Sequence, residues 1–92
     1  MKRLKRGLLD SIINEFMNLD VGYAYVMVEN VDPKYLSKQL KRKLRYRGIN
    51  DIVEVRGTGN LIILEHKEKP MFKEEDGRIL IKRIPTIKRK NI

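Results

Sequence analysis

One stretch of the sequence, from Pro33 to Gly48, constrains the fold more than any other. It holds seven Lys or Arg residues and no acidic residue. Asp32 is a favourable N-cap, Pro33 suits the first helical turn, and Gly48 suits the position just past a helix end. The sequence therefore predicts a single helix over Pro33–Arg47 that is bounded at both ends by its own residues.

This predicted helix has two chemically different sides. At about 100° per residue, Leu36, Leu40 and Leu44 fall on one stripe that must face a core. Tyr35 and Tyr46 fall on the boundary between the two sides. The side opposite the leucines carries only cations, namely Lys34, Lys38, Lys41, Arg42 and Arg45. A helix with an apolar back and a cationic front indicates an anionic partner.

The charge of the whole chain is unevenly distributed. The 92 residues have a net charge of +9, yet three acid-free segments hold 16 of the 21 Lys and Arg residues: Met1–Arg6, Lys34–Arg47 and Lys82–Lys90. The remainder carries five basic and 12 acidic residues and is mildly acidic. Segregated positive charge attracts polyanions by releasing their counterions, so the pattern favours nucleic acid as the partner.

Composition excludes several other classes of protein. The chain has no cysteine, which rules out disulfides and thiol catalysis. No apolar run approaches the ~18 residues of a membrane span. The basic opening is interrupted by Asp10, Asn14 and Glu15 where a signal peptide would be apolar, so we expect a cytoplasmic protein that does not bind membranes. No metal and no cofactor are expected.

Hydrophobic periodicity predicts a small α+β domain spanning residues 1–92. The predicted order is α-β-α-β-β-β, with two helices packed on one face of a mostly antiparallel four-stranded sheet in a two-layer sandwich. Residues 86–92 are expected to form a basic C-terminal tail that is free to be flexible. Besides the basic helix, the predicted elements are a helix over Leu8–Met17, an interior strand over Tyr23–Glu29, a hairpin of Ile52–Arg56 with Leu61–His66, and a fourth strand over Arg78–Ile84.

The first predicted strand contains a motif related to RNA binding. Gly22-Tyr23-Ala24-Tyr25-Val26-Met27-Val28 resembles the RNP1 submotif of RNA-recognition-motif domains, whose exposed rings stack on bases. The resemblance implies that Tyr23 and Tyr25 form a stacking platform on the sheet. It departs from the motif at Val21, where a basic residue is usual, and at Val28, where an aromatic residue is usual. The alternative is that both tyrosines are ordinary strand residues packed on a neighbour.

A second resemblance covers the segment from Gly48 to Ile84. A helix ending near a glycine, a strand, a turn and two further strands are similar to small endoribonuclease toxins with a double-stranded-RNA-binding-like fold. Here the turn is Gly57-Thr58-Gly59 and lacks the catalytic histidine of that family, so the resemblance implies an RNA-binding surface more than cleavage. Its glycines could also free backbone N–H groups for a phosphate beside Arg56, although a plain hairpin tip is the simpler interpretation.

The sequence gives little support for catalysis. His66 is the only histidine, and Glu74, Glu75 and Asp76 before Gly77 are typical of a solvated turn.

We therefore predict a non-enzymatic protein that binds the phosphate backbone of nucleic acid, with a slight preference for RNA or single strands. The N-terminal Lys2, Arg3, Lys5 and Arg6 are expected to extend the surface. The predicted binding residues are Lys34, Lys38, Lys41, Arg42, Arg45, Tyr35, Tyr46, Tyr23, Tyr25, Arg56, Lys88, Arg89 and Lys90.

Two alternative functions remain open from the sequence. The first is a protein-interaction module, either a small subunit docked on an acidic partner through the cationic helix or a homodimer closed through an unpaired edge strand. The second is an endoribonuclease-type toxin that depends on His66 or on Glu74–Asp76.

Overall fold

The fold is α+β, with two helices and a four-stranded mixed sheet. The computed structural model describes residues 4–58, 60–68, 72–75, 78–81 and 84–91. Strand order in the sheet is β2-β3-β1-β6, and a separate two-stranded sheet joins β4 to β5. The elements are α1 (Leu8–Leu19), β1 (Tyr23–Glu29), α2 (Pro33–Tyr46), β2 (Val53–Thr58), β3 (Leu61–His66), β4 (Phe72–Glu75), β5 (Arg78–Ile81) and β6 (Thr86–Lys90).

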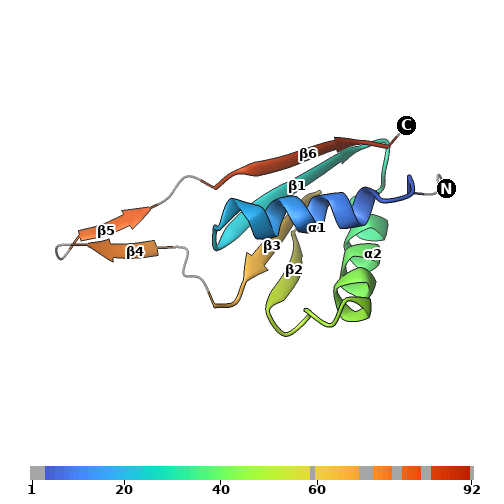
Figure 1. The fold of residues 1–92 in the computed structure, drawn as a ribbon. Coiled ribbons are helices and arrows are strands. Elements are labelled where there is room, and N and C mark those ends of the chain that lie inside the picture. The colour runs from blue at the N-terminus through green and yellow to red at the C-terminus, as the bar shows by residue number, and fades with distance from the viewer. Residues whose placement is uncertain (1–3, 59, 69–71, 76–77, 82–83, 92) are drawn as a thin grey trace.

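Both helices cover the same face of the sheet, as predicted (Figure 1). The apolar stripe of α2 is fully buried, and α1 buries Leu8, Ile12, Ile13 and Phe16 at helical spacing. The alternate residues of the strands meet these helices, so Ala24 and Val26 of β1 are buried. The opposite face of the sheet carries no helix among the residues that the structure describes. We call it the open face.

The ends of α2 follow from its capping residues. The Asp32 side chain accepts a hydrogen bond from the Lys34 backbone N–H at 3.4 Å, which confirms the predicted N-cap. At the other end, Gly48 has φ +71°, and the Ile49 N–H donates to the Leu44 carbonyl at 3.0 Å. Together with the Gly48 N–H to Arg45 carbonyl bond at 3.1 Å, this is a Schellman ending, which favours glycine.

The central strands match their predicted positions. β1 lies inside the sheet, antiparallel to β3 and parallel to β6. β2 and β3 form the predicted antiparallel hairpin, in which Thr58 pairs with Leu61 across the turn; Gly59 lies outside the described residues. Over the part of the chain that is described, neither helix combines the length and the apolar character that crossing a membrane requires.

The predicted strand over Arg78–Ile84 forms only over Arg78–Ile81, and it is not the fourth strand of the main sheet. Residues Arg78–Ile81 form β5, which pairs with β4 in a hairpin that projects from the body of the protein (Figure 1). Glu75 and Arg78 pair directly, so the connection has two residues, and its sequence is Asp-Gly. That dipeptide is a strong signal for a tight hairpin turn, whereas the sequence prediction treated Glu74–Asp76 only as a solvated turn and included no strand directly before it.

The fourth strand of the sheet comes instead from the expected C-terminal tail. β6 pairs in parallel with β1, and Ile87 is buried beneath the helices. Pro85 stands just before this edge strand, a position where its missing N–H costs no ladder bond, and its carbonyl accepts from the Tyr25 N–H at 2.9 Å. Beyond β6, the Asn91 side chain accepts a hydrogen bond from the Lys5 N–H at 2.7 Å. The tail is therefore part of the fold.

Candidate nucleic-acid interface

The structure divides the cations of α2 and its C-cap into two groups. Lys43 and Arg47 both face α1, where Lys43 Nζ lies 3.2 Å from Asp10 Oδ2 and Arg47 Nη1 lies 3.5 Å from Asp10 Oδ1. Their side chains are about one-third exposed. These two ion pairs connect α2 to the first turn of α1, so Asp10 neutralises two basic residues that are not among the predicted binding residues.

The remaining five cations form what we call the α2 cations. They are Lys34, Lys38, Lys41, Arg42 and Arg45, and all five are exposed. None of their side chains makes an ion pair or a hydrogen bond with any residue that the structure describes. At 1.5 Å per residue, Lys34 and Arg45 are about 16 Å apart along the helix axis. The five side chains of the predicted stripe are therefore exposed along the helix without an ion pair to any described carboxylate.

Both tyrosines of α2 flank this surface. Tyr46 is 84% exposed at the C-terminal end of the helix, and Lys43 Nζ lies 5.4 Å from the centre of its ring. Tyr35 is half-buried and lines a hollow of about 340 Å³ between α2 and the N-terminal segment, together with Lys5. Lys5 and Arg6 are exposed and lie on the helix side of the molecule, whereas Lys2 and Arg3 lie outside the described residues.

Lys67 adds a cation that the sequence did not single out. It follows β3 and lines a hollow of about 240 Å³ with Lys41 and Arg45, along the outer edge of β2. Its Nζ lies 3.4 Å from the Asn50 carbonyl oxygen, which accepts a hydrogen bond from it. No local pattern could have identified Lys67, because it stands between Glu65 and Glu68 in sequence and reaches α2 only through the fold.

The two strand tyrosines lie on the other side of the molecule. Tyr23 and Tyr25 point to the open face, since the alternate residues Ala24 and Val26 are buried under the helices. This is the orientation that the RNP1 resemblance implies. It also means that the strand tyrosines and the α2 cations belong to two separate surfaces, one on each side of the sheet.

Arg56 lies on the open face and is neutralised there. Its Nε lies 2.7 Å from Glu65 Oε2, and its Nη2 lies 3.6 Å from Glu54 Oε2. Partial burial together with the hydrogen bond and negative charge of Glu65 raises the pKa of Tyr23, which pairs with Glu65 across the strands. The predicted phosphate contact by Arg56 does not fit this arrangement, because two carboxylates flank the guanidinium.

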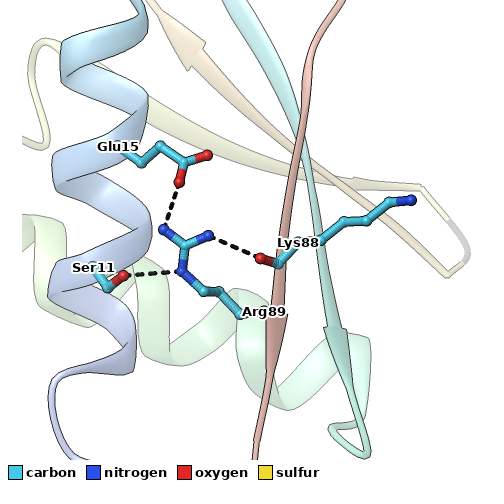
Figure 2. Close-up of polar contacts among 4 residues, drawn as sticks. All are labelled: Ser11, Glu15, Lys88 and Arg89. Carbon is cyan, nitrogen blue, oxygen red and sulfur yellow. Dashed lines mark hydrogen bonds and ion pairs between the residues drawn. The ribbon is translucent and has the colours of Figure 1, made fainter.

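The three basic residues of β6 point in different directions. Lys88 and Lys90 are exposed on the open face, opposite Met27 and Glu29 of β1. Arg89 points to the helix side, where Figure 2 shows its guanidinium between α1 and β6. Arg89 Nε donates to Ser11 Oγ at 2.9 Å, and Nη2 donates to Glu15 Oε1 at 2.6 Å. Arg89 is therefore part of the packing between α1 and β6, which does not fit its predicted role as a phosphate contact.

The groups that the nuclease alternative requires are placed as follows. His66 is only 7% exposed, packs against Phe16 with ring centres 6.5 Å apart, and accepts a hydrogen bond at Nδ1 from the Glu68 N–H. His66 is therefore part of the packing beneath α1. Glu74 and Glu75 lie in β4, and Asp76 lies outside the described residues. Within the described part of the chain, no group of three acidic or histidine side chains is arranged to hold a metal ion.

Comparisons of this chain with models of protein families, with curated proteins and with solved structures find no significant match.

Proposed function

We propose that this protein binds nucleic acid without modifying it, through the phosphate backbone and the α2 cations. One observation carries the proposal: Asp10 takes up Lys43 and Arg47, while the five α2 cations have no carboxylate partner among the described residues. On a helix kept only for solubility, interleaved Glu residues would pair with such cations at i,i+4 spacing. Here the leucine stripe fixes the helix on the sheet and holds the charged side toward solvent.

The spacing of these cations suits a phosphate backbone. A distance of about 16 Å from Lys34 to Arg45 spans several phosphates of an extended strand or two to three phosphates of a duplex crossed diagonally. Lys5 on one flank and Lys67 on the other widen the surface. Contacts of this kind neutralise phosphates and carry no sequence information, so we propose binding with little sequence specificity.

Tyr46 supports a preference for single strands or RNA. Its ring is exposed beside the cations, which is the combination that proteins use to stack unpaired bases while holding the backbone. The open face is left out of this interface, because Arg56 there is already neutralised by Glu54 and Glu65.

The test compares two charge-matched variants in a binding titration with a fluorescent oligonucleotide of about ten nucleotides, short enough to span one α2. Lys38→Gln/Lys41→Gln removes two α2 cations, and Lys88→Gln/Lys90→Gln removes two exposed cations from the opposite side. We expect the first variant to weaken binding at least about tenfold and the second to have little effect. Equal losses in both variants would show that net charge alone attracts the ligand, and the proposed interface would be wrong.

The same titration distinguishes nucleic acid from an acidic protein partner. Polyglutamate presents a string of carboxylates without bases or phosphates. Tighter binding to polyglutamate than to single-stranded RNA or DNA would favour the protein-interaction alternative. Tyr46→Ala should weaken binding to single-stranded RNA more than binding to duplex DNA, because only unpaired bases can stack on the ring.

A further inference from the structure

The open face has an apolar centre that no element covers among the described residues. Met27 is 55% exposed and Leu61 is 37% exposed, although both are large and apolar. Tyr23, Tyr25 and Ile63 continue the patch across β1 and β3, where Tyr25 and Ile63 are direct cross-strand partners. A contiguous apolar patch bordered by charged residues marks an interaction surface.

The charges around this centre fall into two clusters at opposite corners. The first cluster lies on β2 and β3 beside the start of β1, and it has a net charge of −1 from Glu54, Glu65 and Arg56. The second lies on β1 and β6 at the end of β1, and it has a net charge of +1 from Glu29, Lys88 and Lys90. The register places the clusters diagonally across the face, with the apolar centre between them.

This charge pattern does not suit a polyanion. Three cations and three carboxylates cancel over the face, so a phosphate backbone would gain no net attraction and would meet the Glu54–Glu65 corner unfavourably. The pattern does suit a partner with an apolar centre and one corner of each sign. A second copy of the same face meets that description.

We infer that the open face is a self-association surface that joins two copies of this chain, sheet against sheet. In a two-fold dimer the axis lies in the interface plane, perpendicular to the line that joins the two clusters. Rotation about it brings the acidic corner of each copy onto the basic corner of the other and the two apolar centres into contact. The α2 cations then lie on the two outer sides of the dimer, clear of the interface.

The first test is the mass of the full chain in solution. Because interfaces of standard size have Kd values of about 1 µM or tighter, the wild type at about 100 µM should have a mass near twice 10.9 kDa by sedimentation equilibrium. Met27→Glu should raise the dimer Kd at least about 100-fold, since two apolar contacts would be replaced by two buried carboxylates, each drawing the neighbouring Lys88 away from the other copy. Met17→Glu is the matched control, because Met17 is an exposed methionine on α1, away from the open face. It should leave the mass unchanged.

A charge exchange tests the orientation of the two copies. Lys88→Glu/Lys90→Glu and Glu54→Lys/Glu65→Lys should each give a monomer when alone, because like charges then meet at both corners. An equimolar mixture should form a dimer, because every corner again meets its opposite. Recovery in the mixture also shows that both variants are folded.

Three results would overturn the inference. A monomeric wild type at the stated concentration excludes the dimer. A wild-type dimer that Met27→Glu leaves intact places the contact elsewhere, with the edges of β2 and β6 as the next candidates. A monomeric wild type whose oligonucleotide binding is weakened by Tyr25→Ala assigns the open face to nucleic acid instead.

Discussion

At the scale of single residues, Asp10 determines how much of the positive charge near α2 is available to a ligand. Its carboxylate contacts Lys43 and Arg47 from the first turn of α1, where a negative charge also interacts favourably with the helix dipole. The pairs are partly exposed, so each contributes little to folding. In the sequence, Asp10 is recognisable only as an acidic residue that interrupts an apolar segment. The sequence could not show which lysine or arginine the carboxylate meets, because that depends on how the two helices pack.

Asp10→Asn should therefore change stability and binding in opposite directions: the fold becomes slightly less stable and oligonucleotide binding becomes tighter. We expect the free energy of unfolding to fall by about 1 kcal/mol or less, since exposed ion pairs and one dipole contact are lost. Oligonucleotide affinity should rise, and the log–log salt slope should steepen by about 1, the contribution of one more phosphate contact. Urea denaturation and a salt titration measure the two effects. An affinity that falls or stays constant would contradict the position that we assign to the interface.

Tyr23 offers a second test at this scale, on the open face. Its pKa is raised above 10.0 by partial burial and by Glu65, so Glu65→Gln should lower it toward that value. Absorbance follows the ionisation of tyrosine as the pH rises. Subtracting the titration curve of a Tyr23→Phe variant, with and without Glu65→Gln, leaves the titration of Tyr23 in each background. Because the folded-state pKa is the higher one, the stabilising contribution is present below pH 10 and is lost as the pH rises through the folded-state pKa. A Tyr23 pKa unchanged by Glu65→Gln would show that the carboxylate does not act on it.

At the scale of elements, β6 is the feature that the sequence failed to predict. Its five residues include a single apolar side chain, Ile87, in a run of charge, so hydrophobic periodicity gives almost no signal. Two side chains of β6, Ile87 and Arg89, point toward the helices. Arg89 stands where an apolar residue would be expected, and its guanidinium donates hydrogen bonds to Ser11 and Glu15 of α1. By contrast, α2 and β1 were predicted closely because their caps, alternation and apolar spacing are all local. The β4–β5 hairpin was missed although its Asp-Gly signal is local.

Arg89→Ala should destabilise the fold rather than weaken binding. The change removes hydrogen bonds from the guanidinium to Ser11 and Glu15 and leaves a part-buried carboxylate without its cation, so we expect a loss of about 1–3 kcal/mol. Lys88→Ala is the neighbouring control, since its side chain is exposed in the single chain, and at protein concentrations below the dimer Kd it should cost less than about 0.5 kcal/mol. Denaturant unfolding measures both. Equal effects would mean that the contacts of Arg89 do not hold β6 to α1.

At the scale of the whole molecule, the sheet separates two surfaces of different chemistry. The helix side has the five α2 cations facing solvent, and the open face has an apolar centre with balanced charge. The sequence indicated both sets of residues but joined them into one site. Only the strand order and register show that Tyr23 and Tyr25 lie with Ile63 and Arg56 on the far side of the sheet from α2. Long-range pairing of this kind is not encoded in any single segment.

The salt dependence of binding tests the central claim most directly. With five α2 cations neutralising phosphates, the slope of log affinity against log salt concentration should be about −3.5 for a short single-stranded oligonucleotide. Lys38→Gln/Lys41→Gln/Arg45→Gln should reduce the slope to about −1.5, whereas Lys88→Gln/Lys90→Gln should leave it near the wild-type value. A nearly flat wild-type slope, or the same slope in both variants, would contradict an interface built on α2.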